Sequence, residues 1–589
     1  MSTDYYQGAD GDKAYDSYLM KRLLTYLRSY KLLVASALGL LLLVSVLGLS
    51  GPYLIKIAID RHIHNKDMAG LTVIAAVYFL VMFLEFILRY WQIYLMQLTG
   101  QKVMFDLRRQ LFSHLARMQV GFFTEQTIGG LISRLISDIE VLNEMFSAGL
   151  VAVFGDIAML LGIMFMLLYM NWRLALVVFT VIPLIFYVTY LFRQKVRVSF
   201  RAIRQHTARI SAFMQENLTG MSIIQVFNRQ EKNFKQFDRL NNDYLEAYKQ
   251  TIFYYAMFFP VVEFLGALSI ALMLWYGGMQ VIQKLITFGV LVAFIEYNQR
   301  FFRPIDDLME KYNIFQSAMA AAERIFKLLD TPATIRDAPN STPWPGLRQE
   351  ISFQNLSFAY NGEDFILKDI NLRIKKGEKL AVVGLTGSGK TTLVGLLHRF
   401  YEAQSGRVLL DGIDIRNISL HDLRQHTAVI LQEPFIFSGS VCDNIRLGRT
   451  DIPMDKIIWA AHQANAHDFI QQFADGYRHE LKERGADLSA GQKQLLTFAR
   501  ALVFDPQILI LDEATSNIDS QTEGLIQDAL DKILQDRTCI VIAHRLATIQ
   551  KMERIIVMDK GQIKEEGNHQ QLLQQNGLYA KLYRLQFTV

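Results

Sequence analysis

Cysteine is almost absent from this chain of 589 residues, which contains only Cys442 and Cys539. Two cysteines that lie far apart in the sequence exclude both a disulfide framework and a zinc site built from cysteines. A basic stripe with interleaved aromatic residues is also missing, which argues against a nucleic-acid-binding surface. The first apolar run, residues 32–55, starts late, is too long and lacks a small-residue cleavage site, so it is not a cleaved signal peptide.

The composition divides the chain into two parts. Overall, 51% of the residues are hydrophobic and 20% are charged, an average that fits neither a water-soluble enzyme nor a pure membrane bundle. Residues 341–589 carry 28 Lys and Arg against 30 Asp and Glu, whereas residues 1–340 carry 33 against 26. The basic excess therefore belongs to the apolar half, as is typical of the cytoplasmic edges of membrane helices.

The apolar half predicts six membrane spans. Residues 32–55 contain no charge and are long enough to cross about 30 Å of hydrocarbon. The other runs are residues 68–88, 146–170, 174–192, 252–281 and 286–302. Polar stretches of some fifty residues, 89–145 and 193–251, separate the second run from the third and the fourth from the fifth.

The distribution of Lys and Arg predicts the orientation of these spans. Residues 1–31, 89–140 and 193–250 hold five, six and eleven of them, while the connections on the other side hold five in total. The N-terminus, both long polar stretches and everything after the sixth span are therefore expected in the cytoplasm. The polar stretches keep a heptad-like apolar spacing, which predicts helices that continue past the bilayer into the cytosol.

Four carboxylates interrupt the predicted spans. Glu85 lies closer to the cytoplasmic end, while Asp156, Glu263 and Glu296 lie near the middle of the membrane by helix rise. A charge at that depth needs a partner or a water-filled cavity. Two interpretations stay open: an ion pair or hydrogen-bonded acid within the bundle, or direct contact with a cationic cargo.

The polar half begins after a linker and predicts a phosphate-binding loop. The Pro-rich composition of residues 329–347 indicates the linker, so the expected division is 1–31 as an N-terminal segment, 32–328 as membrane domain and 348–589 as ATPase domain. A buried strand at residues 380–383 leads into the pattern G-x-x-x-x-G-K-T and a leucine-rich helix. Its backbone N–H groups are expected to hold phosphate, Lys390 to reach the β- and γ-phosphates, and Thr391 to bind Mg²⁺. The whole set is Gly384, Gly387, Ser388, Gly389, Lys390, Thr391 and Thr392.

A second apolar strand, residues 507–511, ends in Asp512 and Glu513. An acid at the end of such a strand belongs beside a phosphate-binding loop. Asp512 is expected to hold Mg²⁺, usually through water, and Glu513 to orient and deprotonate the attacking water.

Five motifs in order then identify a resemblance. They are the G-x-x-x-x-G-K-T loop, Gln432 in Leu-Gln-Glu-Pro, Leu-Ser-Ala-Gly-Gln ending at Gln492, Asp512-Glu513-Ala-Thr-Ser, and His544 after an apolar strand. Together they resemble, in order and spacing, the ATPase domain of ATP-binding-cassette (ABC) transporters. With six predicted spans in front, nearly the whole chain is similar to an exporter-type half-transporter: an α-helical membrane domain followed by an α/β P-loop domain with a helical subdomain.

The resemblance implies further roles. Tyr360 corresponds to the aromatic residue that stacks on adenine, and Gln432 to the residue that contacts Mg²⁺ or the lytic water. Ser489 and Gly491 correspond to the signature element that binds the γ-phosphate of ATP held by another subunit, and His544 to a γ-phosphate contact. Asp519 corresponds to the loop between two ATPase domains, and the segments 129–138 and 216–229 to the cytoplasmic loops that transmit motion.

The sequence thus predicts ATP-driven export of a small hydrophobic or amphipathic compound, with ATP and Mg²⁺ as cofactors. The chain is expected to dimerise in a bacterial inner membrane, because each ATP site needs two chains. Ala490 stands where the family usually has glycine, and this favours a heterodimer over a homodimer, with this chain as the member that keeps an intact carboxylate. The alternatives are an ATP-gated channel or membrane regulator on the same scaffold and a dedicated lipid flippase.

Overall fold

The computed structural model describes residues 17–339, 341–362, 364–512, 520–542 and 546–587. The chain divides into two compact units: Met1–His114 with Gly129–Asp330, and Leu115–Ile128 with Thr331–Val589. The short segment 115–128 therefore belongs with the second unit, although it lies between helices of the first in the sequence.

The first unit is helical throughout its described residues. Its α-helices are α1 (Ser17–Arg28), α2 (Lys31–Ile57), α3 (Met68–Leu115), α5 (Ile128–Ser133), α6 (Ile139–Glu144), α7 (Val151–Phe179), α8 (Ile182–Thr219), α9 (Met221–Val226), α10 (Gln230–Leu272), α11 (Gly278–Ile282) and α12 (Phe288–Asp330). Short π-helical segments continue them at Ala58–Ile63, Arg134–Asp138, Met145–Leu150 and Met273–Gly277.

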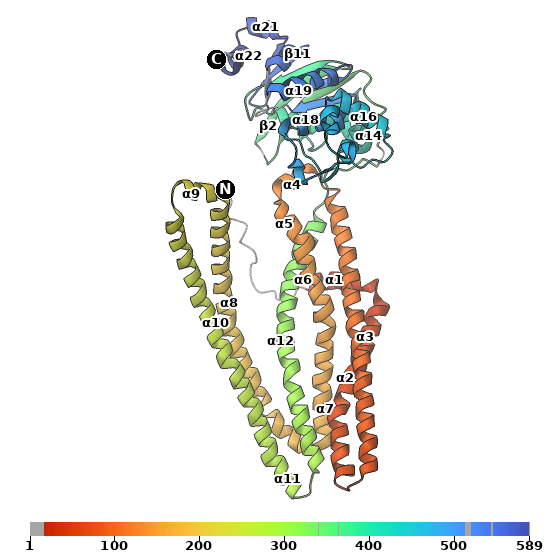
Figure 1. The fold of residues 1–589 in the computed structure, drawn as a ribbon, viewed down its shortest axis with the longest axis vertical. Helices are drawn as coiled ribbons and strands as arrows, with labels where there is room; N and C mark the ends of the chain where they lie inside the picture. Colours follow the sequence, from red (N-terminus) through yellow and green to blue (C-terminus); the bar gives the residue numbers. More distant parts are fainter. Residues whose placement is uncertain (1–16, 340, 363, 513–519, 543–545, 588–589) are drawn as a thin grey trace. The chain divides into compact units, whose positions relative to one another are not determined.

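The long polar stretches of the first unit are helical, as predicted. At 1.5 Å per residue, the 48 residues of α3 extend about 72 Å, far more than a bilayer needs. Helices α8 and α10 run side by side, and α9 joins them at one end (Figure 1). The expectation that the apolar helices continue beyond the membrane is therefore confirmed.

Four helical stretches of the described chain are long and apolar enough to cross a membrane: Lys31–Ile63, Met68–Leu115, Ile128–Phe179 and Gln230–Ile282. The predicted fourth span, residues 174–192, is not one helix. It is divided because α7 ends at Phe179 and α8 begins at Ile182, with Pro183 in its first turn. Proline lacks the N–H that a continuous helix needs but is favourable at a helix start, so the apolar run is split between two helices. The sixth predicted span lies in α12, whose first turns also carry Glu296 and Arg300.

The break between the third and fourth predicted spans, at residues 171–173, has a clear local cause. Asn171 leaves the helical conformation with φ −161° and ψ 105°. Its side-chain oxygen accepts a hydrogen bond from the backbone N–H of Leu174 at 2.9 Å. An asparagine in this position satisfies one of the free N–H groups at the start of the next helical segment.

Pro52 leaves a backbone carbonyl of α2 without its helical partner, and α12 supplies a substitute. The missing N–H of Pro52 would have bonded the carbonyl of Gly48. Arg300 donates to that carbonyl at 2.7 Å, and the Tyr297 hydroxyl donates to the neighbouring carbonyl of Leu49 at 2.5 Å. The proline therefore ties α2 to α12.

This arrangement predicts coupling between Pro52 and Arg300. Replacing Arg300 with methionine is expected to destabilise the protein by about 1–3 kcal/mol, because the Gly48 carbonyl then has no donor. Adding Pro52→Ala restores a backbone N–H, so the double variant is expected to recover most of the loss. Apparent thermal unfolding midpoints in detergent measure both variants, and additive losses would contradict the interpretation.

The structure assigns different surroundings to the carboxylates of the predicted spans. Asp156 forms an ion pair with Lys311 of α12, and both side chains are largely buried, at 16% and 14% exposed. Glu85 bonds Arg89 one turn along α3 at 2.7 Å. Glu263 is exposed on α10 and Glu296 is half-buried on α12. For Asp156 the geometry favours the interpretation as an ion pair within the bundle.

Neutralising Asp156 is therefore expected to cost stability. Asp156→Asn leaves Lys311 buried without its partner, which typically costs about 3 kcal/mol. Adding Lys311→Met is expected to restore most of the thermal stability, whereas the exposed control Glu263→Gln changes it little. A stable Asp156→Asn variant with selective loss of cationic cargo transport would instead favour the cargo interpretation.

The second unit is built around a mostly parallel sheet of six strands in the order β12-β11-β3-β10-β9-β6. Its strands are β3 (Lys379–Val383), β6 (Thr427–Ile430), β9 (Ile508–Asp512), β10 (Thr538–Ile542), β11 (Arg554–Asp559) and β12 (Gln562–Gly567). An antiparallel sheet contains β1 (Glu350–Ala359), β2 (Phe365–Lys375), β4 (Ser405–Leu410) and β5 (Ile413–Asp414), and a small one contains β7 (Gly439–Ser440) and β8 (Glu480–Leu481).

Ten described helices and the short helix α4 complete the second unit. They are α13 (Lys390–Leu397), α14 (Leu420–Gln425), α15 (Val441–Arg446), α16 (Met454–Gln463), α17 (His467–Gln471), α18 (Ala490–Val503), α19 (Ser520–Ile533), α20 (Leu546–Gln550), α21 (His569–Gln574), α22 (Leu578–Phe587) and α4 (Val120–Glu125). The large sheet is covered on both faces. In β3, Leu380 and Val382 pack with the antiparallel sheet, while Ala381 and Val383 pack with α16 and α18. Burial on both faces is why these parallel strands are continuous apolar runs.

Candidate functional site

The predicted phosphate-binding loop lies between β3 and α13. Gly387 and Gly389 adopt φ of +83° and +101°, a left-handed conformation that favours glycine. A Cβ at Gly389 would lie 2.7 Å from the Leu367 side chain and 3.2 Å from the Ile366 carbonyl. The backbone can therefore close over the start of α13 only with glycine at this position.

Two side chains of this loop suit an anion. The hydroxyl oxygen of Ser388 is buried and has no hydrogen-bond partner among the described residues. Lys390 is buried, and its ammonium donates to the carbonyls of Gly384 at 2.8 Å and Leu385 at 3.0 Å. Burial lowers the pKa of Lys390, and the carboxylate of Asp512 opposes that shift. A phosphate at the N-terminus of α13 would supply partners for both side chains.

The acidic and polar residues expected to hold Mg²⁺ come from neighbouring strands. Asp512 ends β9, which is parallel to β10 on one side and to β6 on the other. Gln432 follows β6 and is exposed, and Thr391 is exposed in the first turn of α13. Carboxylate, amide and hydroxyl oxygens at one edge of a parallel sheet suit Mg²⁺, which usually takes few protein ligands besides substrate phosphates. Glu513, Asp519 and His544 lie outside the described residues.

Tyr360 lies immediately after β1, with 47% of its surface exposed. Its hydroxyl forms a 2.9 Å hydrogen bond with the hydroxyl of Thr392 in α13. This hydrogen bond holds the Tyr360 ring beside the phosphate-binding loop, while the face of the ring remains exposed to solvent. An exposed aromatic face in this position is suited to stacking on a nucleotide base.

The Leu-Ser-Ala-Gly-Gln element forms the start of α18. Ser489 is the N-cap: its hydroxyl accepts from the N–H of Gln492 at 3.2 Å, and the Gln492 side chain accepts from the N–H of Ser489 at 2.9 Å. This capping box fixes the helix start. Ser489 and Ala490 are exposed, whereas Gly491 is buried. The methyl group of Ala490 therefore lies on the surface that the resemblance assigns to the ATP of another subunit.

Sequence reasoning missed a polar network that joins α18 to the segment after Gln432. Arg500 donates to the carbonyl of Phe435 and to that of Asn444, both at 2.9 Å. Asn444 in turn bonds the N–H and the carbonyl of Phe437 at 2.9 Å. Burial lowers the pKa of Arg500. An arginine within an apolar helix stripe was the available signal, but its backbone partners lie more than fifty residues away.

The first segment expected to transmit motion lies in the helical unit. The structure places residues 115–128, which contain α4, in the same unit as the ATPase elements, whereas the expected segment 129–138 forms α5 and a π-helical turn of the other unit. Helix α9 does lie within the second expected segment, 216–229, and exposes Ile223 and Val226. The signal that could have identified α4 is Gly121, for which there is no room for a side chain.

Comparison with known proteins gives a consistent result. Residues 34–305 match the family described as "ABC transporter transmembrane region", and residues 367–516 match the family described as "ABC transporter". The chain is 36% identical over 98% of its length to the "Uncharacterized ABC transporter ATP-binding protein YknV" of Bacillus subtilis (strain 168), covering 96% of that protein. It is 35% identical over 97% of its length to an "ATP-dependent lipid A-core flippase" of Syntrophus aciditrophicus, covering 94% of it. It is 34% identical over 96% of its length to the "Putative multidrug export ATP-binding/permease protein YgaD" of Bacillus subtilis, covering 99% of it.

Both halves of the chain are thus accounted for by the same kind of protein. The helical unit corresponds to the transmembrane region and the sheet-containing unit to the ATPase domain. We conclude that the chain belongs to the ABC transporter family, as an exporter-type half-transporter that couples ATP hydrolysis to transport across a membrane.

Proposed function

We propose that this chain is the catalytically intact half of a heterodimeric exporter that moves a small hydrophobic or amphipathic compound out of the bacterial cytoplasm. Each chain has one phosphate-binding loop and one Leu-Ser-Ala-Gly-Gln element. This single copy of each element supports a dimer. If each ATP is held between a phosphate-binding loop and a Leu-Ser-Ala-Gly-Gln element of another chain, two chains are needed to build a site. The apolar runs of the sequence predict six spans per chain, and the distribution of Lys and Arg predicts a cytoplasmic ATPase domain.

In this proposal each residue has a distinct role in binding or hydrolysing one Mg-ATP. Tyr360 stacks on the base, while the loop from Gly384 to Thr392 and the Lys390 ammonium bind the phosphates. Thr391, Gln432 and Asp512 hold Mg²⁺, which would neutralise charge on the phosphates when bound. Glu513 deprotonates the attacking water, and Gln432 and His544 orient it against the γ-phosphate.

The partner's ATP is held by this chain's Ser489 and Gly491, with Asp519 at the boundary between the two ATPase domains. Binding of both ATP molecules closes the dimer and turns the membrane cavity outward, and hydrolysis resets it. The exposed methyl group of Ala490 supports the heterodimer, because it narrows the space in which a backbone must approach a γ-phosphate. The site that borrows this element is then the weaker of the two.

The proposal for the cargo rests on the relatives. One relative is named as a lipid A-core flippase and another as a putative multidrug export protein. A dedicated lipid flippase is therefore the second candidate. An ATP-gated channel or regulator on the same scaffold would hydrolyse ATP without moving cargo against a gradient.

Two measurements test the proposal. The first is ATPase activity of this chain purified alone: we expect low turnover that rises when a second, different half-transporter is added. Robust cooperative turnover from a homogeneous homodimer would disprove the heterodimer. The second is ATP-dependent movement in inside-out vesicles, with a cationic amphipathic dye compared with a fluorescent phospholipid. Movement of only the phospholipid would favour the flippase, and ATP hydrolysis without movement of either would favour the regulator.

A further inference from the structure

The residue that follows the phosphate-binding helix makes contacts in two directions. Tyr401 lies shortly after α13, and its ring contacts Tyr360 edge-on, with ring centroids 5.0 Å apart and an angle of 85°. It also contacts Phe358 of β1 at 5.6 Å, and Phe358 contacts Tyr360 at 5.0 Å. Three aromatic rings therefore form one cluster, whose exposed member is Tyr360.

The opposite edges of the Tyr401 ring lie against two glycines. A Cβ added to Gly121 of α4 would lie 2.9 Å from one edge of the ring, closer than side chains normally approach. A Cβ added to Gly395 of α13 would lie 3.4 Å from the other edge. Tyr401 is thus enclosed between helix α4 and the helix that begins with Lys390, and a shift of its ring has to displace one of them.

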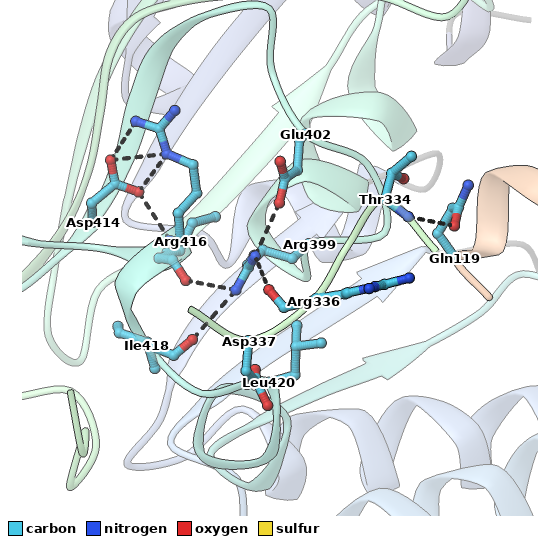
Figure 2. A network of polar contacts seen from close by, with 11 residues as sticks. Gln119, Thr334, Arg336, Asp337, Arg399, Glu402, Asp414, Arg416, Ile418 and Leu420 are labelled. Atoms are coloured by element: carbon cyan, nitrogen blue, oxygen red, sulfur yellow. Dashed lines mark hydrogen bonds and ion pairs between the residues drawn. The ribbon is translucent and has the colours of Figure 1, made fainter. Parts of the chain in front are cut away.

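Polar contacts fasten the same region to the linker, as Figure 2 shows. The buried guanidinium of Arg399 donates to the linker carbonyl of Arg336 at 3.2 Å and to the Glu402 carboxylate at 2.9 Å. Gln119, just before α4, accepts from the N–H of Thr334 in the linker at 3.3 Å. The end of α13, the linker and the segment 115–128 are therefore held as one assembly within this unit.

We propose that α4 transmits motion to the membrane domain, and that Tyr401 is a positioning residue that communicates occupancy of the base site at Tyr360 to this helix. The inference rests on the proposed role of Tyr360 in base stacking. A base stacked on Tyr360 restricts that ring, the edge contact restricts Tyr401, and the tight contact with Gly121 restricts α4. The phosphates act on α13, which Tyr401 also contacts at Gly395, so the base is expected to add to the signal that the phosphates produce alone.

The test uses a fluorescent label on α4 in the full-length transporter. Glu125 is exposed at the end of α4, and Glu125→Cys accepts the label once Cys442 and Cys539 are replaced by serine. The Glu513→Gln substitution is added to prevent turnover. The signal change on adding Mg-ATP is compared with the change on adding Mg-tripolyphosphate, which has phosphates but no base.

We expect Mg-ATP to produce a signal at least three times that of Mg-tripolyphosphate. Tyr401→Leu is expected to reduce the ATP signal to the tripolyphosphate level while ATP affinity changes less than threefold, and Tyr401→Phe is expected to retain it. Gly121→Ala, which crowds the ring from the other side, is expected to alter the signal as well. Its matched control is Gly524→Ala in α19, since a Cβ there has nothing within 4 Å.

Two outcomes would overturn the proposal. An ATP signal in Tyr401→Leu equal to that of the parent would show that α4 responds without this ring. Equal signals for ATP and tripolyphosphate in the parent would show that α4 does not respond to the base. A separate measurement tests whether Tyr360 stacks on the base. If it does not, ATP affinity of Tyr360→Ala is expected to equal that of the parent.

Discussion

Replacing Glu513 with glutamine is expected to lower ATP turnover by about 100-fold or more while ATP binding stays close to that of the parent. Glutamine keeps the size of the side chain but cannot accept the proton of the attacking water. Glu513 directly follows Asp512 in the sequence, and Asp512 is the last residue of β9, which pairs with β10. Phosphate release by the complete transporter, together with binding of a fluorescent ATP analogue, measures the two effects separately.

A matched control separates this effect from a general change of charge. Glu553 is exposed in the same domain, and Glu553→Gln is expected to leave turnover near the parent value. Turnover of Glu513→Gln within a few-fold of the parent would show that another group is the principal base. In a heterodimer with a defective partner site, this single substitution is expected to stop nearly all hydrolysis, whereas the equivalent change in the partner would have little effect.

Lys390→Ala is expected to weaken ATP binding itself by about 10- to 100-fold. A hydrogen bond to a charged group contributes about 1.5–3 kcal/mol, and 1.4 kcal/mol corresponds to a tenfold change in affinity. The Lys390 ammonium is already held inside the loop by two backbone carbonyls, so little side-chain ordering is needed when phosphate arrives. Equilibrium binding of ATP and of AMP distinguishes the effect, since AMP lacks the β- and γ-phosphates that the lysine reaches.

The Lys390→Ala substitution is therefore expected to affect three measured quantities differently. ATP affinity is expected to fall steeply and AMP affinity little, while the unfolding temperature in the absence of nucleotide stays near that of the parent. An equal loss for both nucleotides would indicate that the loop itself had been distorted. Unchanged ATP affinity would remove Lys390 from the phosphate site.

Elements with a strong local pattern were predictable from the sequence. The strands β3, β9 and β10 are continuous apolar runs because they are buried on both faces, and such runs are visible without a structure. The helical continuation of the long polar stretches was also predictable, because a heptad-like apolar spacing is visible in the sequence. Capping at Ser489 is likewise local, since both partners of the capping box lie within three residues.

The number of membrane helices was harder to predict from the sequence, because hydropathy reports composition and does not show where a helix breaks. Residues 174–192 form one apolar run, yet the helix ends at Phe179 and restarts at Ile182 beside Pro183. Whether residues 115–128 or 129–138 pack with the ATPase elements depends on contacts with residues hundreds of positions away, such as Tyr401.

The sequence by itself determined the family, the order of the ATPase motifs and the division into an apolar and a polar half, because each of these is encoded within a few neighbouring residues. Only the tertiary structure decided that Asp156 pairs with Lys311, that Arg300 replaces the N–H missing at Pro52, and that Tyr401 contacts both Tyr360 and α4 at Gly121. These contacts join residues far apart in the chain. Their partners are selected by the packing of whole helices and strands, and no local pattern records which distant surface a side chain will meet.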